Sequence, residues 1–533
     1  MAKNKRAQAQ ANDEDKKTTR EDIIATLWKA ADTFRDKIDA ANYKDYILSM
    51  LFVKYLSDYF NERVDELKKQ YPNEILLKRH IGNLPYVLKE ESTFGYLHAN
   101  KEQNDIGRKI TEALNGIETS NSVFGGIFRS IDFNSEAFLG RKEQRNAMLK
   151  NLLIDFSSLN LRPSNIEVKA GEVPADIIGD AYEDMIGKFA TMAGKKAGSF
   201  YTPQAVSEIL AQVVSVQENE TVYDPTCGSG SLLIRAANYA KGKQRVSVYG
   251  QEVNGSAISM AKMNMFLHDI KDADIRWGDT IASPQHLDSN GNLKRFDCIV
   301  ANMPFSLDKW AQGFNIGEDA KPTATMDRWR RFDIGVPPAS KGDWAFLLHM
   351  IASVSGSGRI AAIAPHGVLF RGSSEGIIRK SLIERNLLDA VIGLPENLFY
   401  GTSIPACILV FRKGRTTKDI LFIDASKEFK KVKAKNELTP EHIKKVVSVY
   451  KAFKNGEEQK AEIEKYSCIA SIAEIEENEY NLNIPRYVDT FEEEAPIDIK
   501  KVNTEIAELK SKIADVEKQM AFYLKELGVS DDK

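Results

Sequence analysis

An acid, a glycine-rich turn and an apolar segment follow one another near the middle of the chain. Asp224 ends a short apolar run, Gly228 and Gly230 lie in the turn, and Leu232 to Tyr239 has the pattern of a helix. Glycines let a ligand approach the backbone closely, and the first turn of a helix offers unpaired N–H groups. The turn lacks a Gly-Lys-Ser/Thr sequence, which excludes a nucleoside-triphosphate P-loop. The segment therefore predicts a site for another small ligand.

Two further acids and an amide follow at intervals that suit the same ligand. Glu252 ends a second predicted strand, and a carboxylate about 20 residues past a glycine loop suits the two hydroxyls of a ribose. Asp279 follows a possible third strand, and the apolar run 296–301 leads into Asn302-Met303-Pro304-Phe305. Ligands of open parallel sheets bind at the carboxyl ends of the strands, so we expect these side chains to meet there.

These residues resemble the amino-methyltransferases that use S-adenosylmethionine. Asp224-Pro225-x-x-Gly228-x-Gly230 is similar to their cofactor loop, and Asn302-Met303-Pro304-Phe305 is similar to their target-amine motif, usually Asn-Pro-Pro-Phe. Gly198-Ser199-Phe200-Tyr201-Thr202-Pro203 precedes the loop, which is the motif order of gamma-class adenine-N6 methyltransferases. Past about residue 18, the chain resembles the modification (M) subunit of a type I restriction-modification system.

The resemblance implies S-adenosylmethionine as the cofactor and two groups of site residues. The residues expected to bind the cofactor are Ser199, Phe200, Tyr201, Thr202, Pro203, Gln204, Asp224, Gly228, Ser229, Gly230, Ser231, Glu252 and Asp279. The residues expected to act on the target amine are Asn302, Met303, Pro304 and Phe305. Thr202 and Pro203 also suit the start of a helix, so part of this pattern has a purely structural explanation. No metal is expected to take part.

An exocyclic amine is a poor nucleophile because its lone pair is delocalised into the ring. An enzyme can localise that pair by accepting hydrogen bonds from both N–H groups. In this motif the Asn302 side-chain oxygen would accept one, the Met303 carbonyl would accept the other, and Phe305 would stack on the base. Met303 stands where proline is usual, yet Pro304 still favours an extended conformation before it. A base in a duplex cannot reach such a pocket, so flipping of adenine in DNA is implied.

Other functions remain open from the residues alone. A related amino-methyltransferase could act on RNA or on a glutamine amide of a protein. A scaffold subunit could keep the fold and lack turnover, with Met303 as its symptom. His349 and His366 are candidate general bases, although isolated histidines are more often structural. Cys227 in the loop more plausibly fills the turn than acts as a nucleophile, because no base lies nearby in the sequence.

Composition limits the setting in which the chain works. The chain has 533 residues, enough for two or three domains, and 43% of them are hydrophobic. The formal net charge is −3, so no overall basic field draws the chain to DNA, and we expect a partner to supply much of the grip. Four scattered cysteines are typical of a reducing compartment, and we expect a cytoplasmic protein with no membrane-spanning segment.

Strands alternate with helices from 221 to 411, which is typical of a mostly parallel sheet. With the resemblance, this predicts an α/β fold with a Rossmann-like methyltransferase core of seven strands, a helical N-terminal domain and a C-terminal coiled-coil helix. A capping-box pattern at Thr19 to Asp22 marks the first helix. The expected parts are a disordered tail (1–17), a helical domain (18–165), a catalytic domain (166–430), a charged helical segment (431–490) and a coiled-coil helix (491–533).

Two segments suggest larger partners. The irregular stretch 306–342 is long for a loop inside a domain and is either a mobile surface loop or a DNA-facing loop that orders on binding. Near the C-terminus an apolar seam repeats mainly by alternate fours and threes, which predicts a coiled coil: Val502, Ile506, Leu509, Ile513, Val516, Met520, Tyr523 and Leu527.

The seam requires another helix, from this chain's own N-terminal domain or from a partner. The resemblance favours docking on a specificity (S) subunit. It also implies a second copy of this chain in an M2S1 methyltransferase, a restriction (R) subunit in the full complex, and double-stranded DNA as the substrate.

Overall fold

The computed structural model describes most of the chain in two units. The described residues are 17–35, 37–194, 201–240, 245–314, 321–399, 402–432, 435–490 and 499–527. The units are Met1–Val488 and Asp489–Lys533, and each is treated by itself. The predicted N-terminal tail lies outside the described residues, apart from residue 17. In the part of the chain that is described, no helix has the length and apolar character needed to cross a membrane.

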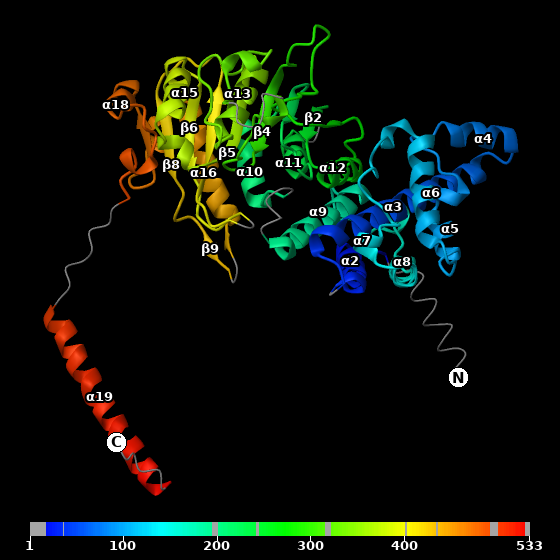
Figure 1. Cartoon of the computed structure of the whole chain (residues 1–533), viewed down its shortest axis with the longest axis horizontal. Helices are drawn as coiled ribbons and strands as arrows, with labels where there is room; N and C mark the ends of the chain where they lie inside the picture. Colours follow the sequence, from blue (N-terminus) through cyan, green and yellow to red (C-terminus); the bar gives the residue numbers. More distant parts are fainter. Residues whose placement is uncertain are drawn as a thin grey trace. The chain divides into compact units, whose positions relative to one another are not determined.

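The first unit begins with a helical region (Figure 1). Its helices are α2 (Arg20–Phe34), α3 (Ala40–Gln70), α4 (Glu74–Gly82), α5 (Phe94–Ala99), α6 (Ile106–Ser120), α7 (Glu136–Leu139), α8 (Lys142–Ser157) and α9 (Pro174–Ala193). The predicted capping box is confirmed, because Thr19 Oγ1 accepts from the Asp22 backbone N–H at 3.1 Å and the Asp22 carboxylate accepts from the Thr19 backbone N–H at 3.0 Å. Helix α3 has buried residues on every side from Tyr46 to Leu56 and forms the centre of this region.

A nine-stranded sheet forms the rest of the first unit, in the order β11-β8-β6-β7-β5-β4-β1-β2-β3. The strands are β1 (Thr221–Asp224), β2 (Ser247–Glu252), β3 (Asp274–Trp277), β4 (Phe296–Asn302), β5 (Val354–Pro365), β6 (Leu388–Gly393), β7 (Ala406–Arg412), β8 (Ile420–Asp424) and β11 (Ser467–Ala470). Strand β7 is antiparallel to β5 and β6, and β11 is antiparallel to β8, whereas the other pairs are parallel. The predicted α/β class is confirmed, and β8 and β11 extend the expected seven strands.

Helices cover both faces of the sheet. Alternate residues of each strand point to opposite sides, so the sheet has two apolar faces to bury. Cys298 and Val300 of β4 pack in one apolar cluster, and Ile299 and Ala301 pack in the other. The first cluster contains α10 (Gln204–Val214), α11 (Ser231–Tyr239) and α16 (Pro440–Lys454). The second contains α13 (Asp343–Ser353), α14 (Gly367–Phe370) and α15 (Ser373–Glu384).

The segment 431–490 was expected to be helical, yet it also contributes a strand. Helices α16, α17 (Glu458–Ala461) and α18 (Ile472–Glu477) lie in it, and β11 pairs along the outer side of β8. Leu421 and Phe422 of β8 are fully buried, so the sheet edge needs this cover. A four-residue strand within a charged stretch has too little periodicity to identify from sequence. Two short antiparallel strands, β9 (Lys430–Lys431) and β10 (Asn436–Glu437), come just before α16.

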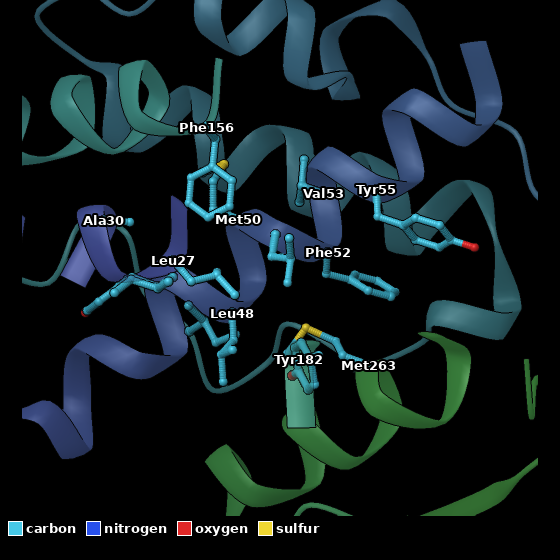
Figure 2. Packing of buried hydrophobic residues seen from close by; sticks show 14 of the residues in the cluster. Leu27, Ala30, Leu48, Met50, Phe52, Val53, Tyr55, Phe156, Tyr182 and Met263 are labelled. Carbon is cyan, nitrogen blue, oxygen red and sulfur yellow. The ribbon is translucent and has the colours of Figure 1, made fainter. Parts of the chain in front are cut away.

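The helical region packs against the part that contains the sheet through α12 (Gly255–Leu267). Figure 2 shows Phe52 of α3 and Tyr182 of α9 in the same packed cluster as Met263 of α12. The rim of this contact is polar, and the Ser256 hydroxyl lies 2.8 Å from both carboxylate oxygens of Asp45. The first helix after β2 is therefore held by both regions.

The described part of the second unit is a single helix, α19 (Ile499–Glu526). Its predicted seam is helical from Val502 to Tyr523, and Leu527 lies just past the helix. Every side chain of the seam is exposed, from 40% for Val502 to 75% for Leu527. A row of exposed apolar side chains on one long helix leaves its hydrophobic area in water, which is unfavourable.

Candidate active site

The glycine loop between β1 and α11 folds as its sequence predicts. Gly228 and Gly230 have φ angles of 53° and 79°, in the left-handed region where side chains are disfavoured. A Cβ atom on Gly230 would lie 2.8 Å from the terminal methyl of Met265 in α12, a flexible side chain that could move aside, so the positive φ is the main reason for glycine here. The loop can therefore lie close to α12 and leave its outer side open.

Glu252 closes the glycine loop from the neighbouring strand. One carboxylate oxygen accepts from the Gly228 backbone N–H at 2.9 Å, and the other accepts from the Asn254 backbone N–H at 2.8 Å. Burial raises the pKa of this carboxyl, and these backbone N–H groups oppose the rise. Glu252 thus shapes the loop in addition to facing the cavity beside it.

Asp224 is buried without a positive partner in the part of the chain that is described. Its Oδ1 accepts from the Thr226 backbone N–H at 2.8 Å. The pKa of this carboxyl is raised to about 8, mainly by burial and partly by the charge of Glu252, while hydrogen bonds from Thr226 oppose the rise. A group with this pKa holds its proton at neutral pH and gives it up readily when a cation approaches.

Two cavities meet at the carboxyl edge of the sheet. The smaller, of about 30 Å³, is polar and is lined by Tyr201, Thr202, Asp224, Thr226, Cys227, Gly228, Ser229, Ser231, Leu232 and Asn302. The larger, of about 310 Å³, is lined by Pro225, Thr226, Glu252, Val253, Asn254, Asp279, Thr280, Ile281, Asn302, Pro304, Leu307, Trp310 and Phe346. Asn302 and Thr226 line both, so they stand where the two cavities adjoin.

The Asn302 side chain is held by one hydrogen bond. Its Nδ2 donates to Thr202 Oγ1 at 3.0 Å, and its Oδ1 accepts from no group in the described ranges of the chain. Thr202 was a candidate helix cap, but Pro203 occupies that position and α10 begins at Gln204. The Thr202 hydroxyl is therefore available to Asn302.

The other residues of the motif differ in their surroundings. The Met303 side chain is 2% exposed and packs in an apolar cluster with Tyr223 and Trp310. Pro304 is exposed, and Phe305 is half-buried with its ring edge-on to Phe399 at 5.8 Å between centroids. The motif is thus anchored through Met303, Pro304 lines the larger cavity, and Phe305 packs beside it against Phe399.

Several predicted residues do not line the two cavities. Ser199 and Phe200 lie outside the described residues, and five others line neither cavity: Pro203, Gln204, Gly230, Met303 and Phe305. Asp279 does line the larger cavity, and its Oδ1 also accepts from the backbone N–H groups of Ile281 and Ala282 at 2.8 and 3.1 Å. Its carboxylate therefore shapes a turn as well as the cavity wall.

The described second part of the long loop is packed into the core beside the larger cavity. Arg331 and Asp327 form a fully buried ion pair, with 2.9 Å between Nη2 and Oδ1. Arg331 Nη1 also donates to the Thr280 carbonyl oxygen at 3.3 Å, in the turn that follows Asp279. The alternative of a freely mobile loop does not fit residues 327–332, because three of them are buried: Asp327, Arg331 and Phe332.

Neither candidate histidine faces the cavities. His349 lies between Arg331 and the Tyr223 hydroxyl, at 3.1 and 3.2 Å, and burial lowers its pKa well below the usual value. His366 lies 3.1 Å from the Ala406 carbonyl oxygen. Both are explained by structure, which leaves the site without a histidine base among the described residues.

The cavity walls also contain residues that the motifs did not identify. Leu307, Trp310 and Phe346 make an apolar wall of the larger cavity, and Phe399 contacts Phe305. Phe399 follows β6, whose carboxyl end lies at the same sheet edge as that of β4, so the strand-end rule could have located it. The wall residues have no such signal, because they come from an irregular loop and a helix.

A possible cation cluster lies away from these cavities. Ligand atoms of Asp180, Glu183 and His268 lie within 4.8 Å of one another, between α9 and the end of α12. Arg235 lies 3.8 Å from Glu183 and already balances part of the negative charge. These residues have no part in the site described above.

Known proteins are similar in sequence to nearly the whole chain. Residues 173–495 match the family model described as N-6 DNA Methylase, and residues 23–156 match the HsdM N-terminal domain. The type I restriction enzyme MpnII methylase subunit of Mycoplasma pneumoniae is 33% identical, over 96% of this chain and 97% of that protein. The MjaVIII methylase subunit of Methanocaldococcus jannaschii is 30% identical, over 96% of this chain and 86% of that protein.

A solved structure agrees with these relatives. The methyltransferase subunit of a type I restriction-modification system from Streptococcus thermophilus superimposes with a TM-score of 0.75 at 35% identity, over 89% of this chain and 100% of that chain. The predicted resemblance is thereby confirmed. The chain belongs to the N-6 DNA methylase family and is a DNA methyltransferase of the kind that forms the methylase subunit of type I restriction enzymes.

Proposed function

We propose that the chain transfers a methyl group from S-adenosylmethionine to the N6 amine of a flipped adenine in DNA, as the modification subunit of a type I complex. The observation that carries the proposal is the position of Asn302. Its amide stands where a polar cavity with a buried acid adjoins a larger apolar cavity, and its oxygen has no partner among the described residues.

The two cavities fit the two ends of the cofactor. Asp224 gives the small cavity a buried carboxyl with no described counter-charge, which suits a cationic methionine end. Glu252 and Asp279 give the larger cavity two acids for ribose hydroxyls, and Trp310 and Phe346 give it apolar area for a nucleobase. When bound, S-adenosylmethionine supplies an electrophilic methyl: the amine nitrogen bonds to its carbon, the carbon–sulfur bond breaks toward sulfur, and one amine proton leaves.

The chain's own contribution is to hold the amine and raise its reactivity. Asn302 Oδ1 would accept one amine hydrogen, and the Met303 carbonyl oxygen would accept the other. No group in the described ranges donates to that carbonyl oxygen. Proline is not needed to fix its direction, because the Met303 side chain is locked in the core. Positioned acceptors of this kind contribute to rate by favouring the charge that develops in the transition state.

The aromatic pair suits capture of the base. Phe305 is half-buried, follows Pro304 of the larger cavity, and packs edge-on against Phe399. An adenine removed from the duplex would stack on Phe305 while its amine reaches Asn302. Stacking and hydrogen bonding together place the amine where transfer occurs.

We further propose an S subunit, a second copy of this chain, an R subunit and DNA as partners, with assembly through α19. The relatives are methylase subunits of type I restriction enzymes, and the exposed seam of α19 supports a helix partner. The four cysteines are unpaired, which fits a cytoplasmic setting.

The test is methyl transfer by the assembled complex. Co-expression with the S subunit of the same system, followed by tritiated methyl transfer to DNA, to RNA and to protein, separates the substrate classes. We expect label in DNA as N6-methyladenine. Label in RNA or in a protein glutamine would favour a related amino-methyltransferase, and cofactor binding without transfer would favour a scaffold subunit.

A further inference from the structure

Thr202 and Asn302 are far apart in the sequence and adjacent in the site. The two side chains are 100 residues apart, yet Asn302 Nδ2 donates to Thr202 Oγ1 at 3.0 Å. Thr202 is 9% exposed, and both residues line the small cavity. We infer that Thr202 is a positioning residue, whose hydroxyl sets which end of the Asn302 amide faces the target amine. The inference rests on the proposed function.

The orientation of the amide decides whether Asn302 can help the reaction. One end is a carbonyl oxygen, which accepts, and the other is an NH2 group, which only donates. A target amine offers N–H groups, so it can pair with the oxygen alone. An amide turned by half a rotation would direct N–H groups at N–H groups. The contact with Thr202 takes up the NH2 end and leaves the oxygen for the amine.

A hydroxyl can donate as well as accept, so Thr202 fixes the Asn302 amide in this orientation when its own hydrogen points away from Asn302. A hydroxyl has one hydrogen and two lone pairs. The hydroxyl lies in the small cavity with Asp224, Thr226 and Ser229, whose oxygens make it a polar surrounding. It does not cap α10, since Pro203 occupies the cap position. Its role is therefore separate from helix formation.

A threonine that positions Asn302 can be told apart from one that only binds the cofactor. If Thr202 served the cofactor alone, its loss would weaken cofactor binding, and saturating cofactor would restore the rate. If it positions Asn302, the rate at saturating cofactor stays low while cofactor affinity is nearly unchanged. The two roles thus predict opposite results in measurements that can be made on the same protein.

The experiment compares Thr202→Val and Thr202→Ser with the parent chain in the assembled complex. Valine keeps the shape and removes the hydroxyl, whereas serine keeps the hydroxyl. We expect Thr202→Val to lower the single-turnover rate at saturating S-adenosylmethionine roughly tenfold, because the half-buried Asn302 amide loses its partner. Its dissociation constant for S-adenosylhomocysteine, measured by calorimetry, should change by less than about threefold. Thr202→Ser should keep the rate within about threefold of the parent.

Ser207→Ala is the matched control for loss of a buried hydroxyl in this segment. Ser207 lies on α10, and its hydroxyl donates only to the Pro203 carbonyl oxygen, at 3.4 Å. We expect the parent rate from this variant. A low rate from Ser207→Ala as well would show that the segment is merely sensitive to substitution, and would overturn the inference.

The inference is also overturned if Thr202→Val methylates at the parent rate, or if extra cofactor restores its rate. A variant that loses its melting transition is replaced by Thr202→Ala and Thr202→Ser, which ask the same question with less side chain. If the parent complex itself transfers no methyl to adenine in DNA, the proposed function has failed. If the parent is active and the valine variant equals it, only the role of Thr202 has failed.

Discussion

The carboxyl edge of the sheet and helix α19 differ in where their side chains find partners. At the sheet edge, the chain itself holds the proposed site residues: Glu252 through two backbone N–H groups, and Asn302 through Thr202. On α19 the seam side chains are 40% to 75% exposed. One region is complete within a single chain, and the other has the form of half an interface. Chemistry and assembly should therefore be separable by mutation.

Removing residues 491–533 should have the largest effect and should act on assembly alone. We expect a truncated chain that folds and binds S-adenosylhomocysteine with the parent affinity, yet does not co-purify with the S subunit. The physical reason is that a long helix with an exposed apolar seam gains most of its stability from a second helix.

A matched control separates the seam from the mere presence of the helix. Leu509→Lys with Val516→Lys changes the seam, whereas Glu508→Lys with Glu517→Lys changes exposed charged positions of the same helix. Only the first pair should block co-purification. Retention of the complex after truncation would contradict the account, and precipitation of the truncated chain would assign the helix to its own core.

Glu252→Ala should weaken cofactor binding at the sheet edge and leave assembly through α19 unchanged. The cost to cofactor binding should be roughly 1.5–3 kcal/mol, the value of a charge-assisted hydrogen bond. The structure adds a second cause, because Gly228 and Asn254 lose the carboxylate that holds the loop.

Glu143→Ala, at an exposed acid in the first turn of α8, serves as the control for Glu252→Ala. Calorimetry with S-adenosylhomocysteine reports the affinity, and co-purification with the S subunit reports assembly. An unchanged affinity in a folded Glu252→Ala chain would move the cofactor site elsewhere.

Cofactor binding should depend on pH through Asp224. In the ligand-free chain burial raises the pKa of Asp224 to about 8, above the usual value, so its ionisation costs stability as pH rises through 8. A cation in the small cavity needs the ionised form and must displace a proton at lower pH. Affinity should therefore rise between pH 6 and pH 8, by up to about tenfold per unit.

Asp224→Asn provides the check on this pH dependence. It should bind more weakly than the parent at pH 8 and show a flat profile between pH 6 and pH 8. A parent affinity that does not vary over this range would contradict the assignment of Asp224 to a cationic group.

Met303→Pro should have the smallest effect on rate. Sequence reasoning predicts retained or raised activity, because proline keeps the carbonyl and stiffens its direction. The structure adds a cost, since the buried Met303 side chain leaves a gap in the core, and loss of such a side chain destabilises by about 2 kcal/mol. Single-turnover rates within about threefold of the parent, with a lower midpoint in urea, are the expected pair of results. A folded but inactive variant would show that the carbonyl assignment is wrong.

The sequence predicts best what is local along the chain. The strand, glycine loop and helix around Asp224 are read from adjacent residues, and the strand-end rule places Glu252 and Asn302 at the same edge. The fold class follows from the alternation of strands and helices. The confirmed capping box at Thr19 has the same basis, a four-residue pattern with a known geometry.

Contacts between distant residues could not be predicted in this way. Thr202 with Asn302, Phe305 with Phe399, and Arg331 with the turn after Asp279 join segments whose spacing carries no periodic signal. Strand β11 could not be predicted because its four residues lie in a charged stretch. They form a strand by pairing with the edge of β8. Such features depend on tertiary packing, which a single sequence does not specify locally.

The most direct test of the account is single-turnover methyl transfer by the complex that contains Asn302→Ala. The change removes one of two acceptors for the target amine from a site that the chain otherwise completes. We expect the rate to fall by about a hundredfold or more, with S-adenosylhomocysteine affinity and co-purification with the S subunit unchanged. Methylation of adenine at the parent rate by this variant would contradict the central claim.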